Sequence, residues 1–193
     1  MKGMVNSEFL GKAFIEHSEV LKNTENVLKE SLLTACNIIN ESISKGNKIL
    51  LFGNGGSAGD AQHIAAEFTG RFVKERRALP AIALTTDTSA ITAIGNDYGF
   101  DKIFERQVYA LANKGDILLG ISTSGNSTNV LNAFKVGKEL GCINIGFSGR
   151  DGGKMNDLCN LNLIVPSTTT ARIQEMHIFI GHIICEFIDN LNI

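Results

Sequence analysis

Two short segments of the sequence combine glycine, asparagine and hydroxyl side chains in a way that suits phosphate binding. The first runs from Gly53 to Ser57 and the second from Ser122 to Ser127. Glycine lets backbone N–H groups come close to an anion, and hydroxyls donate hydrogen bonds to phosphate oxygens without adding charge. Either loop alone could be an ordinary turn with a serine at a helix start. Two such loops favour a phosphate site.

A second group of residues could carry acid–base or metal chemistry. His63 and Glu67 are four residues apart, so on a helix they share one face, and Arg71 follows one turn later if that helix continues. His63 and Glu67 could bind one metal ion or form a surface pair. Gln174 and His182 are separated by about 12 Å of helix rise, too far for one regular helix to bring both easily to one ion. Either their helix is irregular, or they serve different roles or different subunits.

The first loop also matches two other glycine motifs. Residues 53–58 fit the dinucleotide pattern G-x-G-x-x-A, but no acidic residue ends a strand about 20 positions later. Residues 55–59 fit the nucleophile elbow G-x-S-x-G, with Ser57 as the nucleophile and His182 downstream. A serine hydrolase that uses Ser57 is therefore a lesser alternative, although it leaves the second loop unexplained.

These loops need strands and helices to position them, and the hydropathy pattern predicts both. Short apolar runs, most of them continuous, occupy residues 48–52, 81–84, 116–121, 143–147 and 161–165. Continuous runs are typical of strands buried on both faces. Helical spacing occurs at residues 58–68, 103–111, 128–140 and 171–188. The pattern predicts a doubly wound, mainly parallel five-stranded sheet flanked by helices, with ligands beyond the carboxyl ends of the strands.

The first 46 residues have a different pattern. From Ser7 to Ser44 the apolar residues recur at helical spacing, and we expect two helices that end before Gly46. So long a helical region needs a surface to pack on, and a small sheet offers limited cover. The pattern therefore favours contact with another subunit.

Composition and charge exclude several classes of protein. A chain of 193 residues with 44% hydrophobic and 20% charged residues is typical of one soluble domain. A net charge of -2 creates no general field for nucleic acid or an anionic membrane. The four cysteines form no CxxC pair, and no apolar stretch has the length of a signal peptide core or a membrane span. We expect a cytoplasmic protein with neither nucleic acid nor a membrane as partner.

Three further features are given structural interpretations. The basic cluster of Lys74, Arg76 and Arg77 is interpreted as a solvated turn without a function. His17 and His177 are interpreted as packing or surface residues. None of the three features is assigned to the site.

The two loops, together with His63, Glu67, Gln174 and His182, resemble the sugar isomerase (SIS) domain family, and within it the phosphoheptose isomerases. The hydroxyl loop resembles the wider SIS family. The resemblance to the phosphoheptose isomerases in particular depends on three further features: the pair His63 and Glu67, the pair Asn96 and Asp97, and the late residues Gln174 and His182. The resemblance covers nearly the whole chain. It implies the SIS fold in one domain over residues 1–193, with the helical residues 1–46 used in oligomer packing.

The resemblance also implies a set of site residues. The implied substrate contacts are Asn54, Gly55, Gly56, Ser57, Glu67, Arg71, Asn96, Asp97, Ser122, Thr123, Ser124, Ser127 and Gln174, of which Ser122, Thr123, Ser124 and Ser127 hold the phosphate. One zinc ion per subunit is implied at His63, Glu67, Gln174 and His182, without a nucleotide cofactor. The implied assembly is a homotetramer with active sites between subunits, which would relieve the spacing problem of Gln174 and His182.

The implied reaction is an aldose–ketose isomerisation. Sedoheptulose 7-phosphate would become D-glycero-D-manno-heptose 7-phosphate through an enediolate, as the first step of activated-heptose biosynthesis for lipopolysaccharide or capsule. Glu67 is the expected base and His182 the expected acid, because imidazole titrates close to neutral pH. The alternative from another class is a non-catalytic SIS protein that senses a sugar phosphate or docks a protein partner as a tetramer.

Overall fold

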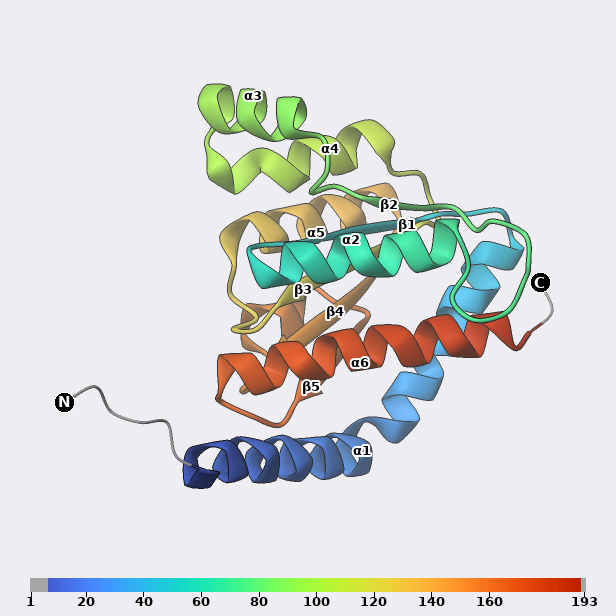
Figure 1. The fold of residues 1–193 in the computed structure, drawn as a ribbon. Helices are drawn as coiled ribbons and strands as arrows, with labels where there is room; N and C mark the ends of the chain where they lie inside the picture. The colour runs from blue at the N-terminus through green and yellow to red at the C-terminus, as the bar shows by residue number, and fades with distance from the viewer. Residues whose placement is uncertain (1–6, 192–193) are drawn as a thin grey trace.

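The computed structural model describes residues 7–191, which are built around a five-stranded parallel sheet (Figure 1). The strands are β1 (Ile49–Gly53), β2 (Ala81–Ala83), β3 (Ile117–Ser122), β4 (Ile143–Gly149) and β5 (Leu161–Val165). Their order across the sheet is β2-β1-β3-β4-β5, and every neighbouring pair is parallel. The predicted parallel sheet is confirmed, and each strand lies close to the apolar run that predicted it.

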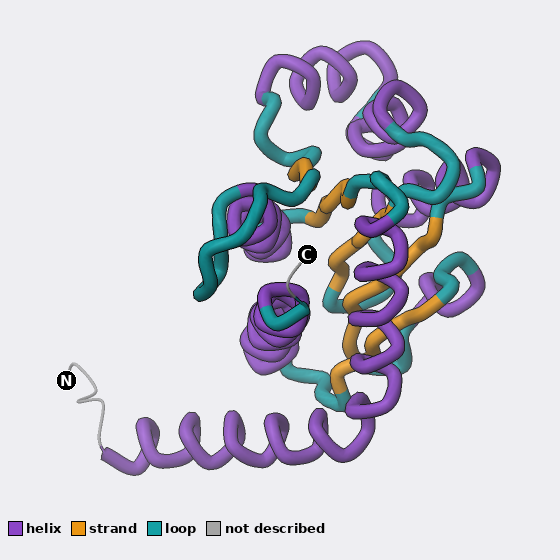
Figure 2. Tube along the Cα trace, turned by 90° about the vertical axis from the view of Figure 1, so that its right-hand side faces the viewer, coloured by secondary structure: helices purple, strands orange, loops and turns teal. Residues whose placement is uncertain are grey.

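Helices cover both faces of this sheet (Figure 2). They are α1 (Ser7–Ser44), α2 (Gly56–Thr69), α3 (Thr88–Tyr98), α4 (Ile103–Leu111), α5 (Thr128–Leu140) and α6 (Thr170–Asp189), with short 3-10 helices at Phe100–Lys102 and Gly153–Asp157. Because side chains alternate along a strand, the core divides into two clusters. Ile49 and Leu51 of β1 pack with α1, α2 and α6. Leu50 and Phe52 pack with α4 and α5. The doubly wound arrangement is thereby confirmed.

The N-terminal region corrects one expectation. Residues Ser7–Ser44 form one helix, not two, and both views show that α1 changes direction between its ends (Figures 1 and 2). No proline occurs in this segment and its glycine, Gly11, lies near the start, so nothing in the sequence ends the helix. The first six residues of the helical region expected at 1–46 lie outside the described residues. Within residues 7–191, no helix is long and apolar enough to cross a membrane.

Parallel pairing brings the functional loops to one edge of the sheet. In the register of the strands, Gly53 is opposite Ile121, and Ser122 is opposite Ser148. The chain therefore leaves β1, β3 and β4 at neighbouring points, and helices α2 and α5 begin there. This is the edge at which ligands bind in doubly wound sheets.

Candidate functional site

The loop between β1 and α2 is shaped by its glycines. A Cβ on Gly53 would lie 2.8 Å from the Ser57 Cβ and 2.9 Å from the Ile121 carbonyl oxygen, so only glycine fits where the first loop meets β3. Gly55, the N-cap of α2, has a φ of 56°, and no side chain caps the helix. An uncapped helix start presents N–H groups and a positive dipole end, which suit an anion.

The loop between β3 and α5 presents hydroxyls at a second helix start. The Oγ atoms of Ser122 and Ser127 are 2.9 Å apart, and the N-cap Ser127 does not cap α5 with its side chain. By contrast, Asp87 caps α3 by accepting a hydrogen bond of 2.9 Å from the Ala90 N–H. The structure thus brings the two predicted loops together at one edge, each followed by a helix without a side-chain cap.

A pair of asparagines joins the two loops. The Asn54 Nδ2 donates to the Asn129 Oδ1 at 2.9 Å, and the Asn129 Nδ2 donates to the Asn54 Oδ1 at 2.8 Å. Asn129 is buried in the first turn of α5. Asn129 was not predicted as a site residue. Its place beside the apolar Val130 and Leu131, in a helix that must pack on the sheet, could have indicated a buried polar role. The pair fixes the spacing between the two loops.

Three of the four expected metal ligands meet between α2 and α6. The His63 Nε2 lies 3.1 Å from the Glu67 Oε1, and the His182 Nε2 lies 3.4 Å from the His63 Nε2. The two imidazole rings have centroids 5.0 Å apart, and the Phe72 ring lies 5.3 Å from that of His182. The His63 side chain is 49% exposed and that of Glu67 22% exposed, so the cluster is open to a ligand.

Gln174, the fourth expected ligand, is on α6 and lies beside the first turn of α2, away from His63. A Cβ on Gly56 would be 2.6 Å from the Gln174 Nε2, so Gln174 packs against the first loop. Helix α6 is continuous from Thr170 to Asp189, which rules out the alternative of an irregular helix and leaves different roles or different subunits for Gln174 and His182. Among residues 7–191, no three His, Cys, Asp or Glu side chains already form a metal-binding group. The cluster is a chain in which His63 contacts both Glu67 and His182.

Other expected contacts lie apart from the loops. Helix α2 ends at Thr69, so Arg71 is on the following loop, where it donates to the Val73 carbonyl oxygen at 3.2 Å. Asn96 donates to the Asp97 carboxylate at 2.8 Å near the end of α3, a helix without a buried residue. In the described part of the chain, no hydrogen bond links Arg71, Asn96 or Asp97 to either loop.

Asp60 is a titratable residue near the cluster that was not among the predicted site residues. Burial raises the pKa of its carboxyl to about 6, against the opposing effect of nearby His63. The Asp60 Oδ2 is buried without a hydrogen-bond partner among the described residues. A carboxyl in this state titrates near neutral pH, one helical turn before His63.

Ser57 lacks the surroundings of a hydrolase nucleophile. It is buried, and among the described residues no hydrogen bond joins its hydroxyl to a histidine. His182 instead contacts His63. A nucleophilic serine needs a base within hydrogen-bond reach, so the hydrolase alternative loses its support.

The basic cluster after α2 corrects a second expectation. The Arg76 side chain is 5% exposed, and its Nε lies 2.6 Å from the Oδ1 of Asp189, which is 1% exposed. Arg76 also donates to the carbonyl oxygens of Glu67 at 2.8 Å and Phe68 at 3.0 Å. The interpretation of Arg76 as part of a solvated turn is wrong, because the carbonyls at the end of α2 and the end of α6 enclose it.

The surroundings of His177 and His17 agree with the prediction that they are packing or surface residues. His177 is fully buried and its Nε2 lies 2.9 Å from the Ser148 carbonyl oxygen. Burial lowers the pKa of His177 to about 4, so its ring is neutral. His17 pairs with Glu175 at 2.7 Å on the surface.

Comparisons with known proteins agree on one family. The SIS domain model matches residues 14–149. A phosphoheptose isomerase of Aliarcobacter butzleri is 64% identical over 179 residues, which are 93% of this chain and 95% of the relative. Among solved structures, the phosphoheptose isomerase GmhA of Neisseria gonorrhoeae has a TM-score of 0.91 at 47% identity, covering 95% of this chain and 98% of its own. The phosphoheptose isomerase of Francisella tularensis has a TM-score of 0.93 at 39% identity, covering 97% and 100%.

Proposed function

Because the chain belongs to the SIS domain family together with the phosphoheptose isomerases, we infer that it is an isomerase of sedoheptulose 7-phosphate. The product is D-glycero-D-manno-heptose 7-phosphate, and the reaction passes through an enediolate. The observation that carries this function is the cluster of Glu67, His63 and His182 beside two loops suited to phosphate. A sensor needs the loops alone, whereas isomerisation also needs a base and an acid.

The reaction moves one proton between two carbons and one between two oxygens. Glu67 takes the proton from C1 and returns it to C2, and His182 moves a proton between O1 and O2. The carbonyl at C2 thereby becomes a hydroxyl and the hydroxyl at C1 becomes a carbonyl. Glutamate and histidine are common residues for such transfers. Glu67 is held for this role by its contact of 3.1 Å with His63.

The loops orient the other end of the sugar phosphate. Ser122, Thr123, Ser124 and Ser127 would donate to the phosphate, together with the N–H groups at the start of α5. The first loop and Gln174 would hold the sugar chain, since Gln174 packs on Gly56. Seven residues of α2 separate Gly56 from His63, a rise of about 10 Å. The first loop and the acid–base cluster would therefore contact different parts of the sugar chain.

We propose one zinc ion per subunit at the same cluster. Imidazole nitrogens and carboxylate oxygens are zinc donors, and two nitrogens bound to tetrahedral zinc are about 3.3 Å apart. The observed 3.4 Å between the Nε2 atoms of His63 and His182 fits that spacing. Glu67 would be the third ligand. Gln174 would be the fourth, either after leaving its place beside Gly56 or from a neighbouring subunit, because about 10 Å of helix rise separates Gly56 from His63. Bound zinc supplies a Lewis acid that stabilises negative charge on the substrate oxygens.

We propose a cytoplasmic homotetramer in which active sites lie between subunits. In a single chain, Arg71, Asn96 and Asp97 make no hydrogen bond to the loops within residues 7–191, and α3 has no buried residue. A neighbouring subunit would cover such surfaces and complete the set of sugar contacts. In this proposal residues 1–193 are one SIS domain whose helical N-terminal region contributes to packing between subunits.

The test is turnover of sedoheptulose 7-phosphate by the pure protein, followed by detection of the aldose product. The Glu67→Gln variant should lose about a thousandfold in kcat, as expected for loss of a general base, while inorganic phosphate still binds. Preincubation with a chelator should also remove activity. Glu139→Gln, on the far end of α5 where Glu139 bonds Tyr109, is the matched control and should be active. Wild-type protein that binds the substrate without forming an aldose would overturn the isomerase function.

A further inference from the structure

The phosphate loop after β3 contains no positively charged residue. Its side chains from Ser122 to Ser127 are hydroxyls and one amide, separated by Gly125. A phosphate monoester carries between one and two negative charges at neutral pH, and a charged donor binds it more strongly than a hydroxyl. A cation beside the loop would therefore strengthen phosphate binding.

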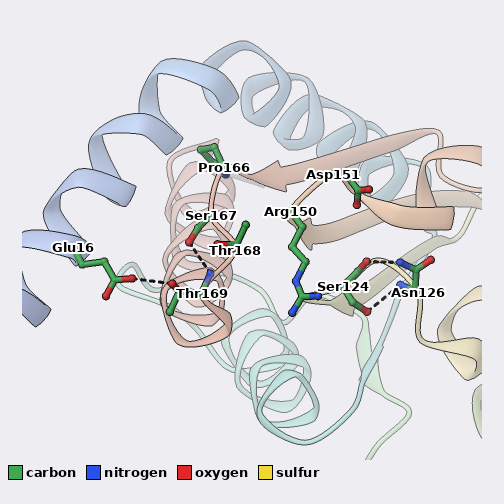
Figure 3. A pocket seen from close by; sticks show the side chains of 9 residues that line it. All are labelled: Glu16, Ser124, Asn126, Arg150, Asp151, Pro166, Ser167, Thr168 and Thr169. Atoms are coloured by element: carbon green, nitrogen blue, oxygen red, sulfur yellow. Dashed lines mark hydrogen bonds between the residues drawn. The ribbon is translucent and has the colours of Figure 1, made fainter.

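Arg150 lines a hollow that reaches this loop. The hollow has a volume of about 830 Å³ and is bounded by α1, the loops after β3 and β4, and the connection from β5 to α6. Ser124 and Asn126 of the phosphate loop form one wall, and Arg150 is the basic residue of the lining. Figure 3 shows the Arg150 side chain directed into the space beside Ser124.

The backbone of Arg150 has an unusual conformation. Its φ is 59°, and it is the one residue other than glycine with a positive φ among residues 7–191. Left-handed backbone costs free energy for any residue with a Cβ, and the nearby positions with positive φ, Gly152 and Gly153, are glycines. The Arg150 N–H donates to the Ser167 carbonyl oxygen at 2.9 Å, which holds this conformation. Residues held in such conformations gather at ligand sites.

The turn that carries Arg150 is fixed to the phosphate loop. The Met155 N–H donates to the Gly125 carbonyl oxygen at 3.1 Å, and the Lys154 N–H donates to the Asn126 Oδ1 at 3.1 Å. A Cβ on Gly125 would overlap the Gly152 carbonyl oxygen, so the two segments are in close contact. The Arg150 backbone is therefore held at a set position relative to Ser124.

The charge of Arg150 is available to a ligand. No ion pair among residues 7–191 involves Arg150. The two acidic residues of the hollow have other partners, because Glu16 accepts a hydrogen bond from the Thr169 hydroxyl at 2.8 Å and Asp151 accepts one from the Gly153 N–H at 3.1 Å. We propose that Arg150 binds the substrate phosphate from the β4 side of the hydroxyl loop, which rests on the proposed function of that loop.

Two variants test this role. Arg150→Asn removes the charge but tolerates left-handed backbone, and Arg150→Lys keeps a charge. Loss of a charge-assisted bond should raise the KM for sedoheptulose 7-phosphate about tenfold or more, with kcat changed less than about threefold, because the phosphate is bound alike in the ground and transition states. The dissociation constant of inorganic phosphate, measured by calorimetry, should rise in parallel. Arg150→Lys should recover most of the loss.

The matched control is Lys154→Asn. Lys154 is an exposed cation of the same turn, but it lines a different hollow on the α5 side of Asn126, together with Lys135 and Asp157. Removal of the Lys154 charge should leave KM and phosphate affinity unchanged. If Lys154→Asn had an effect as large as that of Arg150→Asn, the effect would come from the general positive charge of the turn, and a direct contact between Arg150 and phosphate would be contradicted. Arg150→Asn binding inorganic phosphate within about twofold of wild type would overturn the inference. Because this titration needs no turnover, it separates failure of the Arg150 role from failure of the isomerase function.

Discussion

Gly56 and Gln174 form a contact that constrains the site at the level of single residues. The Gln174 Nε2 occupies the space where a side chain at position 56 would begin, 2.6 Å from an ideal Cβ. Real Cβ contacts do not occur at that distance, so a larger residue at position 56 must displace Gln174. Gln174 is both a proposed sugar contact and a proposed zinc ligand. Because Gly56 has no side chain, it leaves the room in which the Gln174 amide is held.

The Gly56→Ala variant should accordingly lose activity with little loss of stability. We expect kcat/KM for sedoheptulose 7-phosphate to fall at least about tenfold, because small displacements of positioning groups have large effects on rate. Gly59→Ala is the matched control on the same helix, since a Cβ there meets nothing within 4 Å. Replacing glycine in a helix by alanine should raise the free energy of unfolding by about 0.5–1 kcal/mol without changing activity. Equal activity of both variants would show that the position of Gln174 is not critical.

At the level of elements, a buried ion pair joins the ends of α2 and α6. Arg76 bonds Asp189 and the last carbonyls of α2, and Asp189 also accepts the N–H groups of Val73 and Lys74 at 2.7 and 2.9 Å. Burial acts to raise the pKa of Asp189, but these donors outweigh it and the pKa is lowered. The pair thus connects the helix that carries Glu67 with the helix that carries His182.

Breaking this pair should destabilise the fold strongly. Arg76→Met leaves Asp189 buried without its counter-ion and should lower the free energy of unfolding by about 3–5 kcal/mol in urea denaturation at fixed protein concentration. Lys74→Met is the control: its ammonium group bonds Asn190 at the surface, and its loss should cost less than about 1 kcal/mol.

The pH dependence gives a second check on the same pair. Because the folded pKa of Asp189 is lowered, its contribution is full above the unfolded value of about 4 and is lost as the pH falls through the folded pKa. The difference in stability between wild type and Arg76→Met should therefore shrink on acidification below pH 4. A difference that stays constant there would exclude the ion pair as its source.

At the level of the whole molecule, local patterns predicted the elements better than they predicted the site. Helices α4 and α5 begin and end at the residues expected from spacing. The contact between His63 and Glu67 could be predicted from the sequence, because the two residues are four positions apart on one helix. The contact of His63 with His182 spans 119 residues and depends on how α2 packs on α6, which no local pattern contains. The burial of Arg76 by Asp189 was missed for the same reason.

The surface of the described chain carries apolar side chains along α1 and α6. Phe14 is 74% exposed and Val27 is 61% exposed on α1. A groove of about 570 Å³ runs between α1 and α6, and Leu33 and Phe179 both line it and are exposed. Exposed apolar surface of this extent is typical of an interface with another protein. Helix α6 also packs on α2, the helix that carries the proposed base Glu67.

If the proposed homotetramer uses this surface, charge placed in the groove should separate the subunits. Leu33→Glu combined with Phe179→Glu should yield a smaller assembly by light scattering after size exclusion, because burying two carboxylates in an apolar interface is unfavourable. Turnover should fall with assembly size, since Arg71, Asn96 and Asp97 would lose the site they complete. Leu111→Glu, at an exposed apolar position on the end of α4, is the control and should remain tetrameric and active. A double variant that stays tetrameric would place the interface elsewhere, and a dissociated variant with full turnover would show that each subunit holds a complete site.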